Sequence, residues 1–438
     1  MEAAAKRLQL LAQLMRLTMS DTLRNIITRN QAGECIAIPS VCSAHPEVLS
    51  ASMQLASNLN LPMVIEATSN QVNQFGGYTG MNAHKFVSFI DDLKSKHRVG
   101  SNIIELGGDH LGPQVWKSEA ADVAMSKAND LVSEYVRAGI KKIHLDCSQG
   151  CANEPPLVDS ETAAERAADL AVSCLDAASA PEELLFVIGT EVPPPGGARL
   201  GDDGQIIPTS PESAVKTLEE HRTAFSKKGI ADSWSQVAGL VVQPGIEFGP
   251  DEIFTMSKNS NCDFRGVISE YSGICLEAHS TDFQPPEMFA RLANMGFAFQ
   301  KVGPALTFAL RRALYALDQI VQTLNPSAVS LPQVMEAAMR NNPEHWKSHY
   351  SENDYSKWHF SYADRIRYYW PLPSVQEAVD NLILTFDTLN VPDHILEGTF
   401  SLEVMERSHG LAESQGRSIV RSAVQGALLP YFIGERNG

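Results

Sequence analysis

Residues 103–113 read Ile-Ile-Glu-Leu-Gly-Gly-Asp-His-Leu-Gly-Pro: a short apolar run, Ile103–Leu106, that ends in two glycines and an Asp-His pair. Seven other runs along the first two thirds of the chain have the same layout. Each is about 4–6 residues long, too short for a helix, and continuous in hydrophobicity, as in strands that are buried on both faces. The seven runs are Ile36–Val41, Met63–Ala67, Lys142–Asp146, Leu185–Thr190, Ala238–Gln243, Ile274–Ala278 and Phe297–Val302.

Helical stretches separate these runs, among them Lys117–Ala138, Ser160–Ala177 and Ser213–Lys228. Alternation of strands and helices implies right-handed parallel crossovers. Eight such units favour a closed barrel over an open doubly wound sheet. We therefore predict an α/β fold, a (β/α)8 TIM barrel with a C-terminal helical subdomain.

The expected domain boundaries follow from the extent of this strand–helix alternation. The barrel is predicted over residues 20–326, where the amphipathic helix Ala305–Thr323 closes the last unit. Residues 327–438 lack the strand–helix alternation and are expected to form the helical subdomain. Residues 1–19 form an N-terminal extension of uncertain origin, helix-forming but without the continuous apolar stretch of a signal peptide.

The composition is that of an acidic globular protein. The 438 residues include 35 Lys plus Arg against 52 Asp plus Glu, a formal net charge of −17. Nucleic acids and anionic membranes bind Lys/Arg-rich surfaces, so neither partner is expected, and no apolar run approaches the roughly 20 residues of a membrane span. The seven cysteines are scattered without a C-x-x-C pair, which indicates reduced thiols and a cytoplasmic protein.

Polar clusters follow nearly every predicted strand. The C-terminal ends of barrel strands converge on one face, where barrel enzymes place their chemistry. Asp, Ser, Thr and Gly also follow strands because they cap the next helix, and capping is a sufficient explanation for Ser148 or Ser280. Capping does not explain Asp109-His110, Glu191 and His279 together.

The leading candidates are a proton carrier and a metal site. Asp109 is the candidate general acid/base, and His110, Glu191 and His279 are the candidate metal ligands. His279 lies four predicted strands after His110, which places the two imidazoles across the mouth from each other. Imidazole and carboxylate ligands favour Zn2+ or another divalent metal. His144 lies within its strand and reads more readily as a satisfied core residue.

Several polar residues at the same strand ends are candidate substrate ligands. Lys301 could form a Schiff base with a carbonyl substrate if burial lowered its pKa, or it could form a structural ion pair, which we favour. Glycine-rich turns at residues 74–80, at residues 193–197 and at Gly303-Pro304 could present backbone N–H groups to a phosphate, or could be plain turns. The loop that contains Asn70, Gln71, Asn73 and Gln74 is rich in amide side chains, which could bind sugar hydroxyls or cap backbone groups. The candidate substrate-binding residues are Asn70, Gln71, Gln243, Glu247, Lys301 and Gly303.

The densest aromatic segment of the chain runs from His345 to Trp370. Its stretch Asp364-Arg-Ile-Arg-Tyr-Tyr-Trp370 could close over the barrel mouth, bring Arg365 or Arg367 to a phosphate, or dock a partner subunit. The alternative is the aromatic core of a helical subdomain.

Nine long motifs together resemble a known family, among them Ile65-Glu-Ala-Thr-Ser-Asn-Gln-Val-Asn-Gln-Phe-Gly-Gly-Tyr-Thr-Gly80 and Gly107-Gly-Asp-His-Leu-Gly-Pro113. The others lie at residues 40–46, 142–146, 188–193, 242–245, 277–282, 301–308 and 364–371. They are similar to the Z-type subunit of D-tagatose-1,6-bisphosphate aldolase, the GatZ/KbaZ family, over about residues 20–438.

The resemblance implies a class II aldolase-like barrel in galactitol or amino-sugar catabolism. In that family the Z chain is usually a non-catalytic partner of a zinc-dependent Y-type chain that yields dihydroxyacetone phosphate and glyceraldehyde 3-phosphate. By analogy with the catalytic class II aldolases, Asp109 takes the proton and His110 binds zinc, with Glu191 and His279 as further counterparts. Their central zinc histidine has no clear match, because the strand ending at Gln243 offers only Gln243 or Glu247.

Three hypotheses follow. The chain is an accessory subunit of a tagatose-bisphosphate aldolase, or an autonomous metal-dependent aldolase or epimerase acting on a ketose or ketose phosphate. The third, a sugar-phosphate kinase, matches another name used in the family, but the sequence contains no G-x-x-x-x-G-K-[ST] phosphate loop. A ketose phosphate, a Y-type subunit and further copies of the chain are the expected partners.

Overall fold

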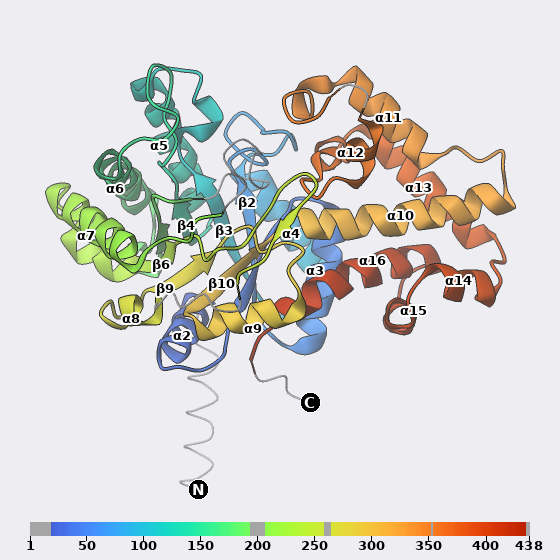
Figure 1. The fold of residues 1–438 in the computed structure, drawn as a ribbon, viewed down its shortest axis with the longest axis horizontal. Helices are drawn as coiled ribbons and strands as arrows, with labels where there is room; N and C mark the ends of the chain where they lie inside the picture. Colours follow the sequence, from blue (N-terminus) through green and yellow to red (C-terminus); the bar gives the residue numbers. More distant parts are fainter. Residues whose placement is uncertain (1–18, 193–205, 258–263, 352–353, 435–438) are drawn as a thin grey trace, which may run out of the picture.

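The computed structural model describes residues 19–192, 206–257, 264–351 and 354–434, and in them eight parallel strands close into a barrel (Figure 1). Around the barrel the order is β1-β10-β9-β6-β5-β4-β3-β2. The prediction of a (β/α)8 TIM barrel is confirmed. The strands are β1 (Ile38–Cys42), β2 (Met63–Thr68), β3 (Ile104–Leu111), β4 (Lys142–Leu145), β5 (Leu185–Ile188), β6 (Val237–Val241), β9 (Cys275–Ala278) and β10 (Phe297–Val302).

The helices that follow the strands form the outer layer. They are α3 (Pro46–Leu59), α4 (Ala83–His97), α5 (Ala121–Arg137), α6 (Ser160–Ala177), α7 (Pro211–Lys227), α8 (Phe264–Ser269), α9 (Pro286–Asn294) and α10 (Pro304–Leu324). A hairpin of β7 (Glu247–Phe248) and β8 (Ile253–Phe254) lies between β6 and α8. No helix in the described part of the chain is long and apolar enough to cross a membrane.

The N-terminal end of the barrel is closed by α2 (Met19–Gln31). Leu23, Ile26 and Ile27 of this helix are buried in one apolar cluster with the strand residues Ile38, Val64, Leu185, Ala238 and Phe299. Polar groups in the barrel interior are therefore approached from the opposite, C-terminal end of the strands. The predicted extension up to residue 18 lies outside the described residues.

The C-terminal region is helical, as predicted. It contains α11 (Leu331–Asn341), α12 (Tyr355–Phe360), the 3₁₀ helix η5 (Arg365–Tyr369), α13 (Pro373–Thr388), α14 (Asp393–Thr399), α15 (Leu402–His409) and α16 (Gln415–Leu428). The long helix α10 extends away from the barrel, and α16 packs against α10 and α3 (Figure 1). One hydrophobic core includes residues of both regions, from Val41 to Phe432. The boundary near residue 326 stays a prediction.

A buried ion pair fixes η5 against α10. The carboxylate of Asp364 accepts hydrogen bonds from Arg311 Nη2 at 2.8 Å and from Thr307 Oγ1 at 2.5 Å. The Arg311 and Asp364 side chains are fully buried. This contact positions the segment from residue 364 to 370 beside the C-terminal ends of the strands.

A second ion pair joins α16 to the first barrel unit. Arg421 Nε lies 2.7 Å from Glu47 Oε2 at the start of α3. Burial alone would raise the pKa of Glu47, but the hydrogen bond and charge of Arg421 lower it below the ordinary value of 4.5. At neutral pH the ionised carboxylate therefore stabilises the docking of α16.

We expect Glu47→Gln to lower the free energy of unfolding at pH 7 by about 1.5–3 kcal/mol, the range for a hydrogen bond to a charged group. Because the folded-state pKa of Glu47 lies below its unfolded value, this stabilisation is present above the unfolded pKa. It is lost as the pH falls through the folded pKa. Urea unfolding at pH 7 and at successively more acidic pH measures the difference, with the exposed Glu397→Gln as control. A loss of stability that did not shrink in acid would contradict the ion-pair role.

Candidate active site

A bulge in β3 turns two consecutive side chains, Asp109 and His110, into the barrel mouth. The pairing of β3 with β4 shifts register between Gly108 and Leu111, and His110 has a φ of 47° in the left-handed region. Side chains of a regular strand alternate between faces, so this irregularity is what lets both neighbours face inward. The ladder with β2 continues to Asp109, so β3 runs further than the predicted Ile103–Leu106.

The glycine before this bulge makes room for an interior charge. A Cβ at Gly107 would lie 2.9 Å from the Glu66 side chain, closer than real Cβ contacts allow. Glu66 thereby reaches the barrel axis, where its carboxylate is fully buried.

Four interior side chains form a closed ring of alternating charge, which we call the charge ring: Glu66, Lys142, Glu277 and Lys301. Lys142 Nζ lies 2.5 Å from Glu66 Oε1 and 2.5 Å from Glu277 Oε2. Lys301 Nζ lies 3.1 Å from Glu66 Oε2 and 3.0 Å from Glu277 Oε1. Each carboxylate therefore bridges both ammonium groups, and the ring connects β2, β4, β9 and β10 across the barrel.

The Lys301 ammonium also donates to Asp109 Oδ1, which joins the charge ring to the mouth. Burial alone would lower the pKa of Lys301, but Asp109, Glu277 and Glu66 raise it well above its ordinary value. A Schiff base requires a neutral amine, so the geometry favours the ion-pair interpretation of Lys301.

Asp109 is held from several sides. Besides Lys301, its Oδ1 lies 3.0 Å from His144 Nδ1, and its Oδ2 lies 3.4 Å from Cys42 Sγ. Burial alone would raise the pKa of Asp109, but the charges of His110 and Lys301 lower it well below its ordinary value. Asp109 is thus an ionised carboxylate at the pocket wall.

Three buried imidazoles face one another beside Asp109. The ring centroids of His110, His144 and His279 lie 5.0–5.1 Å apart in all three pairings. His110 Nδ1 lies 2.7 Å from Asp146 Oδ2, and His279 Nε2 lies 2.9 Å from Glu277 Oε1. Carboxylates that orient the outer nitrogen of an imidazole are the usual support for metal-binding histidines.

The donor set fits a divalent metal ion. Asp109, His110 and His144 offer ligand atoms within 4.8 Å of one another, and so do His144, Glu277 and His279. Burial, followed by the charge of Lys301, lowers the pKa of His279 to about 3, so its ring is neutral. His144 Nε2 is buried without a hydrogen-bond partner among the described residues. It carries a free lone pair in the tautomer whose Nδ1–H donates to Asp109, whereas in the other tautomer Nδ1 accepts the His110 N–H, 3.1 Å away. A buried imidazole nitrogen without a partner, beside two further imidazoles, fits the ligand chemistry of zinc.

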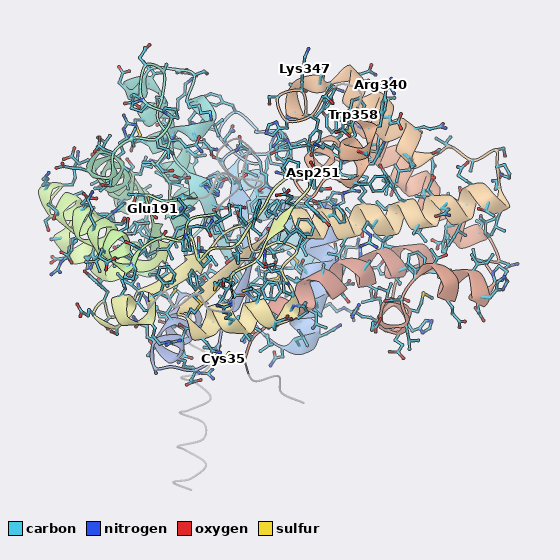
Figure 2. The ribbon with its side chains drawn as sticks, in the orientation of Figure 1. Cys35, Glu191, Asp251, Arg340, Lys347 and Trp358 are labelled. Carbon is cyan, nitrogen blue, oxygen red and sulfur yellow. The ribbon has the colours of Figure 1, made fainter. Side chains whose placement is uncertain are left out.

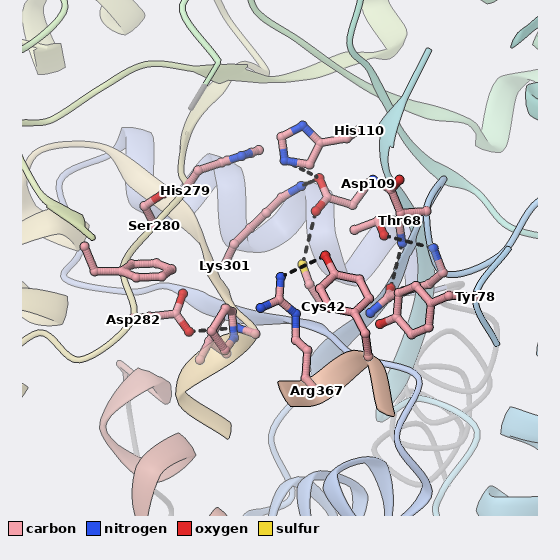
Figure 3. Close-up of a pocket in the computed structure, with 17 residues that line it drawn as sticks. Cys42, Thr68, Tyr78, Asp109, His110, His279, Ser280, Asp282, Lys301 and Arg367 are labelled. Atoms are coloured by element: carbon pink, nitrogen blue, oxygen red, sulfur yellow. Dashed lines mark hydrogen bonds and ion pairs between the residues drawn. The ribbon is translucent and has the colours of Figure 1, made fainter. Parts of the chain in front are cut away.

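Seven of the ten predicted site residues line one pocket at the mouth. Figure 3 shows the side chains of Asp109, His110, His279 and Lys301 directed toward it, together with Arg367 from η5. Cys42, Tyr78 and Tyr368 add to the wall. The predicted residues that line the pocket are Asn70, Gln71, Asp109, His110, His279, Lys301 and Gly303.

The other three predicted residues lie elsewhere. Glu191 is exposed beside α7, where its carboxylate accepts from Ser213 Oγ at 2.5 Å and Thr209 Oγ1 at 2.6 Å (Figure 2). Gln243 accepts from the Gly245 and Ile246 backbone N–H groups and so stabilises its own turn. Glu247 is buried in β7 and accepts from the Phe248 N–H. The structure does not bring Glu191 to the imidazoles, and His144 stands there instead.

The predicted phosphate turns are engaged by the protein itself. The Gly303 and Ala305 N–H groups donate to Asp282 Oδ1 at 3.0 and 2.8 Å. In the turn at residues 74–80, the N–H groups of Phe75 and Gly77 donate to Asn73 Oδ1. The turn at residues 193–197 lies outside the described residues.

Several residues of this site were not among the predicted site residues, including Glu66, Lys142, His144 and Glu277. For the last three the signal in the sequence is alternation. Lys142, His144 and Asp146 are spaced by two along one strand, as are Glu277 and His279, and this spacing places them on one face.

Comparison with known proteins places the chain among sugar-phosphate aldolase relatives. Residues 23–435 match the model of the family described as D-tagatose-1,6-bisphosphate aldolase subunit GatZ/KbaZ-like. The crystal structure of a probable tagatose 6 phosphate kinase from Sinorhizobium meliloti 1021 is 40% identical, with a TM-score of 0.80, covering 90% of this chain and 99% of that one.

Two further structures are more distant. Fructose-bisphosphate aldolase from Campylobacter jejuni is 15% identical, with a TM-score of 0.47, covering 85% of this chain and 95% of that one. The YdjI aldolase from Escherichia coli K12 is 13% identical, with a TM-score of 0.40, covering 83% and 95%. Similarities at this distance carry no information about the site.

Proposed function

Because the chain belongs to the D-tagatose-1,6-bisphosphate aldolase subunit GatZ/KbaZ-like family, we propose that its barrel mouth performs class II aldolase-type chemistry on a ketose phosphate. The observation that carries the proposal is the cluster of three buried imidazoles beside a buried carboxylate. His110, His144 and His279 would hold a divalent metal, zinc by ligand type. A metal bound there would stabilise negative charge on the substrate oxygens during carbon–carbon bond cleavage.

Asp109 is the proton carrier in this proposal. In aldol cleavage a base removes the proton of the C4 hydroxyl, the C3–C4 bond breaks, and its electron pair stays on the C3 fragment. Asp109 Oδ2 accepts that proton, because Oδ1 is bound by Lys301 and His144, whereas Oδ2 accepts only from the weak thiol donor of Cys42 among the described residues. Lys301 and His144 keep the carboxylate in one orientation.

The same groups support epimerisation at C4. If the aldehyde fragment turns over before the C3–C4 bond re-forms, the bond closes on its opposite face. The proton on Asp109 then returns to the C4 oxygen, so the atoms of substrate and product balance. Cleavage is complete when the proton on Asp109 passes to C3 of the other fragment and both fragments leave, whereas in epimerisation both fragments stay and the C3–C4 bond re-forms.

The accessory role is the second candidate, and the word subunit in the family description favours it. In that case the chain supports a separate Y-type aldolase chain in the cytoplasm, in galactitol or amino-sugar catabolism, and the mouth binds the substrate or product without turning it over. A kinase ranks last, since the sequence contains no recognisable phosphate loop.

Metal content of the purified full chain tests the proposal. After incubation with zinc and removal of the excess, we expect about one zinc per chain, the stoichiometry of one three-histidine site. His110→Ala, His144→Ala and His279→Ala should each lose it, because removing one of three protein ligands leaves too few to retain the ion. The exposed His84→Ala is the matched control and should keep its metal.

Activity then separates the two candidates. Metal-loaded chain alone should cleave tagatose 1,6-bisphosphate or interconvert C4-epimeric ketose phosphates, monitored by product analysis. Absence of bound metal, with aldolase activity appearing only after addition of a Y-type chain, would overturn autonomous catalysis and leave the accessory role.

A further inference from the structure

We propose that Arg367 binds the phosphate group of the substrate, at the boundary between two connected compartments of the barrel mouth. The identity of the substrate rests on the proposed function. The anion site itself rests on the charges that line the pocket, and it can be tested without turnover.

Two cationic groups other than histidine line the described mouth pocket, Lys301 and Arg367. The Lys301 ammonium is bonded to three carboxylates, those of Glu66, Glu277 and Asp109. Its charge is therefore already more than balanced, and it has little attraction left for a phosphate dianion.

The N-terminus of α10 is also closed to an anion. The N–H groups of Gly303 and Ala305 point toward Asp282, whose carboxylate occupies the position that a phosphate would take. A ligand would have to displace a covalently attached anion to use these donors.

Arg367 is held differently. Its Nη1 donates to the backbone carbonyls of Ala363 at 2.5 Å and Asp364 at 3.1 Å, and its Nη2 donates to Tyr368 Oη at 3.2 Å. Within the described residues no carboxylate forms an ion pair with this guanidinium. A half-buried guanidinium that is oriented by neutral acceptors keeps its charge available for a ligand.

The fold sets this orientation in advance. Arg367 is anchored through the Asp364 backbone, and the Asp364 side chain is clamped by Arg311 and Thr307 of α10. The guanidinium carbon also lies 4.7 Å from the ring centroid of Tyr368. Binding therefore costs little loss of side-chain freedom.

The position of Arg367 suits a linear substrate. Arg367, Cys42, Gln71 and Tyr78 line both the mouth pocket and a second pocket beside it, which extends to Trp370 and the start of α3. A phosphate at this boundary leaves the reacting carbons of an open-chain ketose phosphate beside Asp109. The segment around Arg367 thus binds the substrate phosphate in addition to contributing aromatic side chains to the core.

Calorimetric titration of the full chain with inorganic phosphate tests the site. We expect Arg367→Met to weaken phosphate binding by roughly tenfold or more, because a charge-assisted, forked donor is lost. Arg365→Met is the matched control: Arg365 lies over the same Tyr368 ring but donates to the His345 carbonyl and does not line the pocket. The control should bind within about twofold of wild type, since it leaves the forked donor in place.

Several results would overturn the inference: no phosphate binding by the wild type, an unchanged affinity in Arg367→Met, or an equal loss in Arg365→Met. If Arg367→Met fails to fold in a thermal scan, Arg367→Lys replaces it and should still bind phosphate more weakly, because it lacks the fork. As a second readout, Arg367→Met should reduce the preference in kcat/KM for a ketose phosphate over the unphosphorylated ketose. Failure of the proposed function would abolish turnover in wild type and variants alike while leaving the phosphate titration intact.

Discussion

Asp109→Asn is expected to lower turnover by about 10²–10⁴-fold, the contribution of a positioned general acid or base. Asparagine has the same shape but cannot accept the substrate proton. The fold should remain intact, because Lys301 keeps its bonds to Glu66 and Glu277 in the charge ring. Steady-state kinetics with metal-loaded protein measures the loss, and thermal unfolding checks the fold.

Glu105→Gln is the matched control for this variant. Glu105 is another buried carboxylate on the same strand, but it bonds the Leu106 N–H and lies outside the pocket. The Glu105→Gln variant should keep turnover within about twofold of wild type, as expected for a carboxylate that does not contact the substrate. Unchanged turnover in Asp109→Asn would refute the assignment of Asp109 as proton carrier.

Lys142→Met is expected to reduce the free energy of unfolding by about 3–5 kcal/mol, the cost of removing one partner from a buried ion pair. Methionine fills much of the space, so the loss arises mainly from charge. Glu66 and Glu277 would share one ammonium, that of Lys301, while remaining fully buried. Denaturant unfolding at neutral pH measures the effect.

Lys227→Met provides the contrast on the surface. Lys227 also bridges two carboxylates, Glu161 and Glu165, but it is half exposed. Its loss should cost about 0–1 kcal/mol. In addition, the double variant Lys142→Met/Glu277→Gln should lose less than the sum of its single variants, since they act on one network. Equal effects of Lys142→Met and Lys227→Met would show that the charge ring does not stabilise the barrel.

The barrel was predictable because its signal is repeated. Eight continuous apolar runs separated by helices admit few topologies, and the strand ends marked the mouth through Asp109, His110 and His279. Glu191 was not separable from them by sequence, since it too follows a strand. Only the structure shows it turned toward Ser213 at the start of α7.

The charge ring could not be predicted from the sequence, because its residues belong to the same short apolar runs that indicate the strands. Charged residues such as Lys142 and Glu277 inside short hydrophobic runs look like strand boundaries, because an unpaired buried charge is too costly to expect. The two partners of Lys142, Glu66 and Glu277, lie 76 and 135 residues away from it in the chain. No local spacing in the sequence therefore indicates these contacts. His144 is buried, as expected of a core residue, but its Nε2 has no hydrogen-bond partner among the described residues, which the sequence could not show.

The contact between α16 and α3 has a consequence for biosynthesis. Arg421 and Glu47 are 374 residues apart in the chain, as are Gln425 and the Ala51 carbonyl that it bonds. A ribosome releases β1 and α3 long before α16 exists, so the first unit waits with an apolar flank uncovered. Contacts this distant slow folding and expose intermediates to aggregation. The flank of α3 that packs against α16 therefore stays uncovered during synthesis until the C-terminal helices have been made.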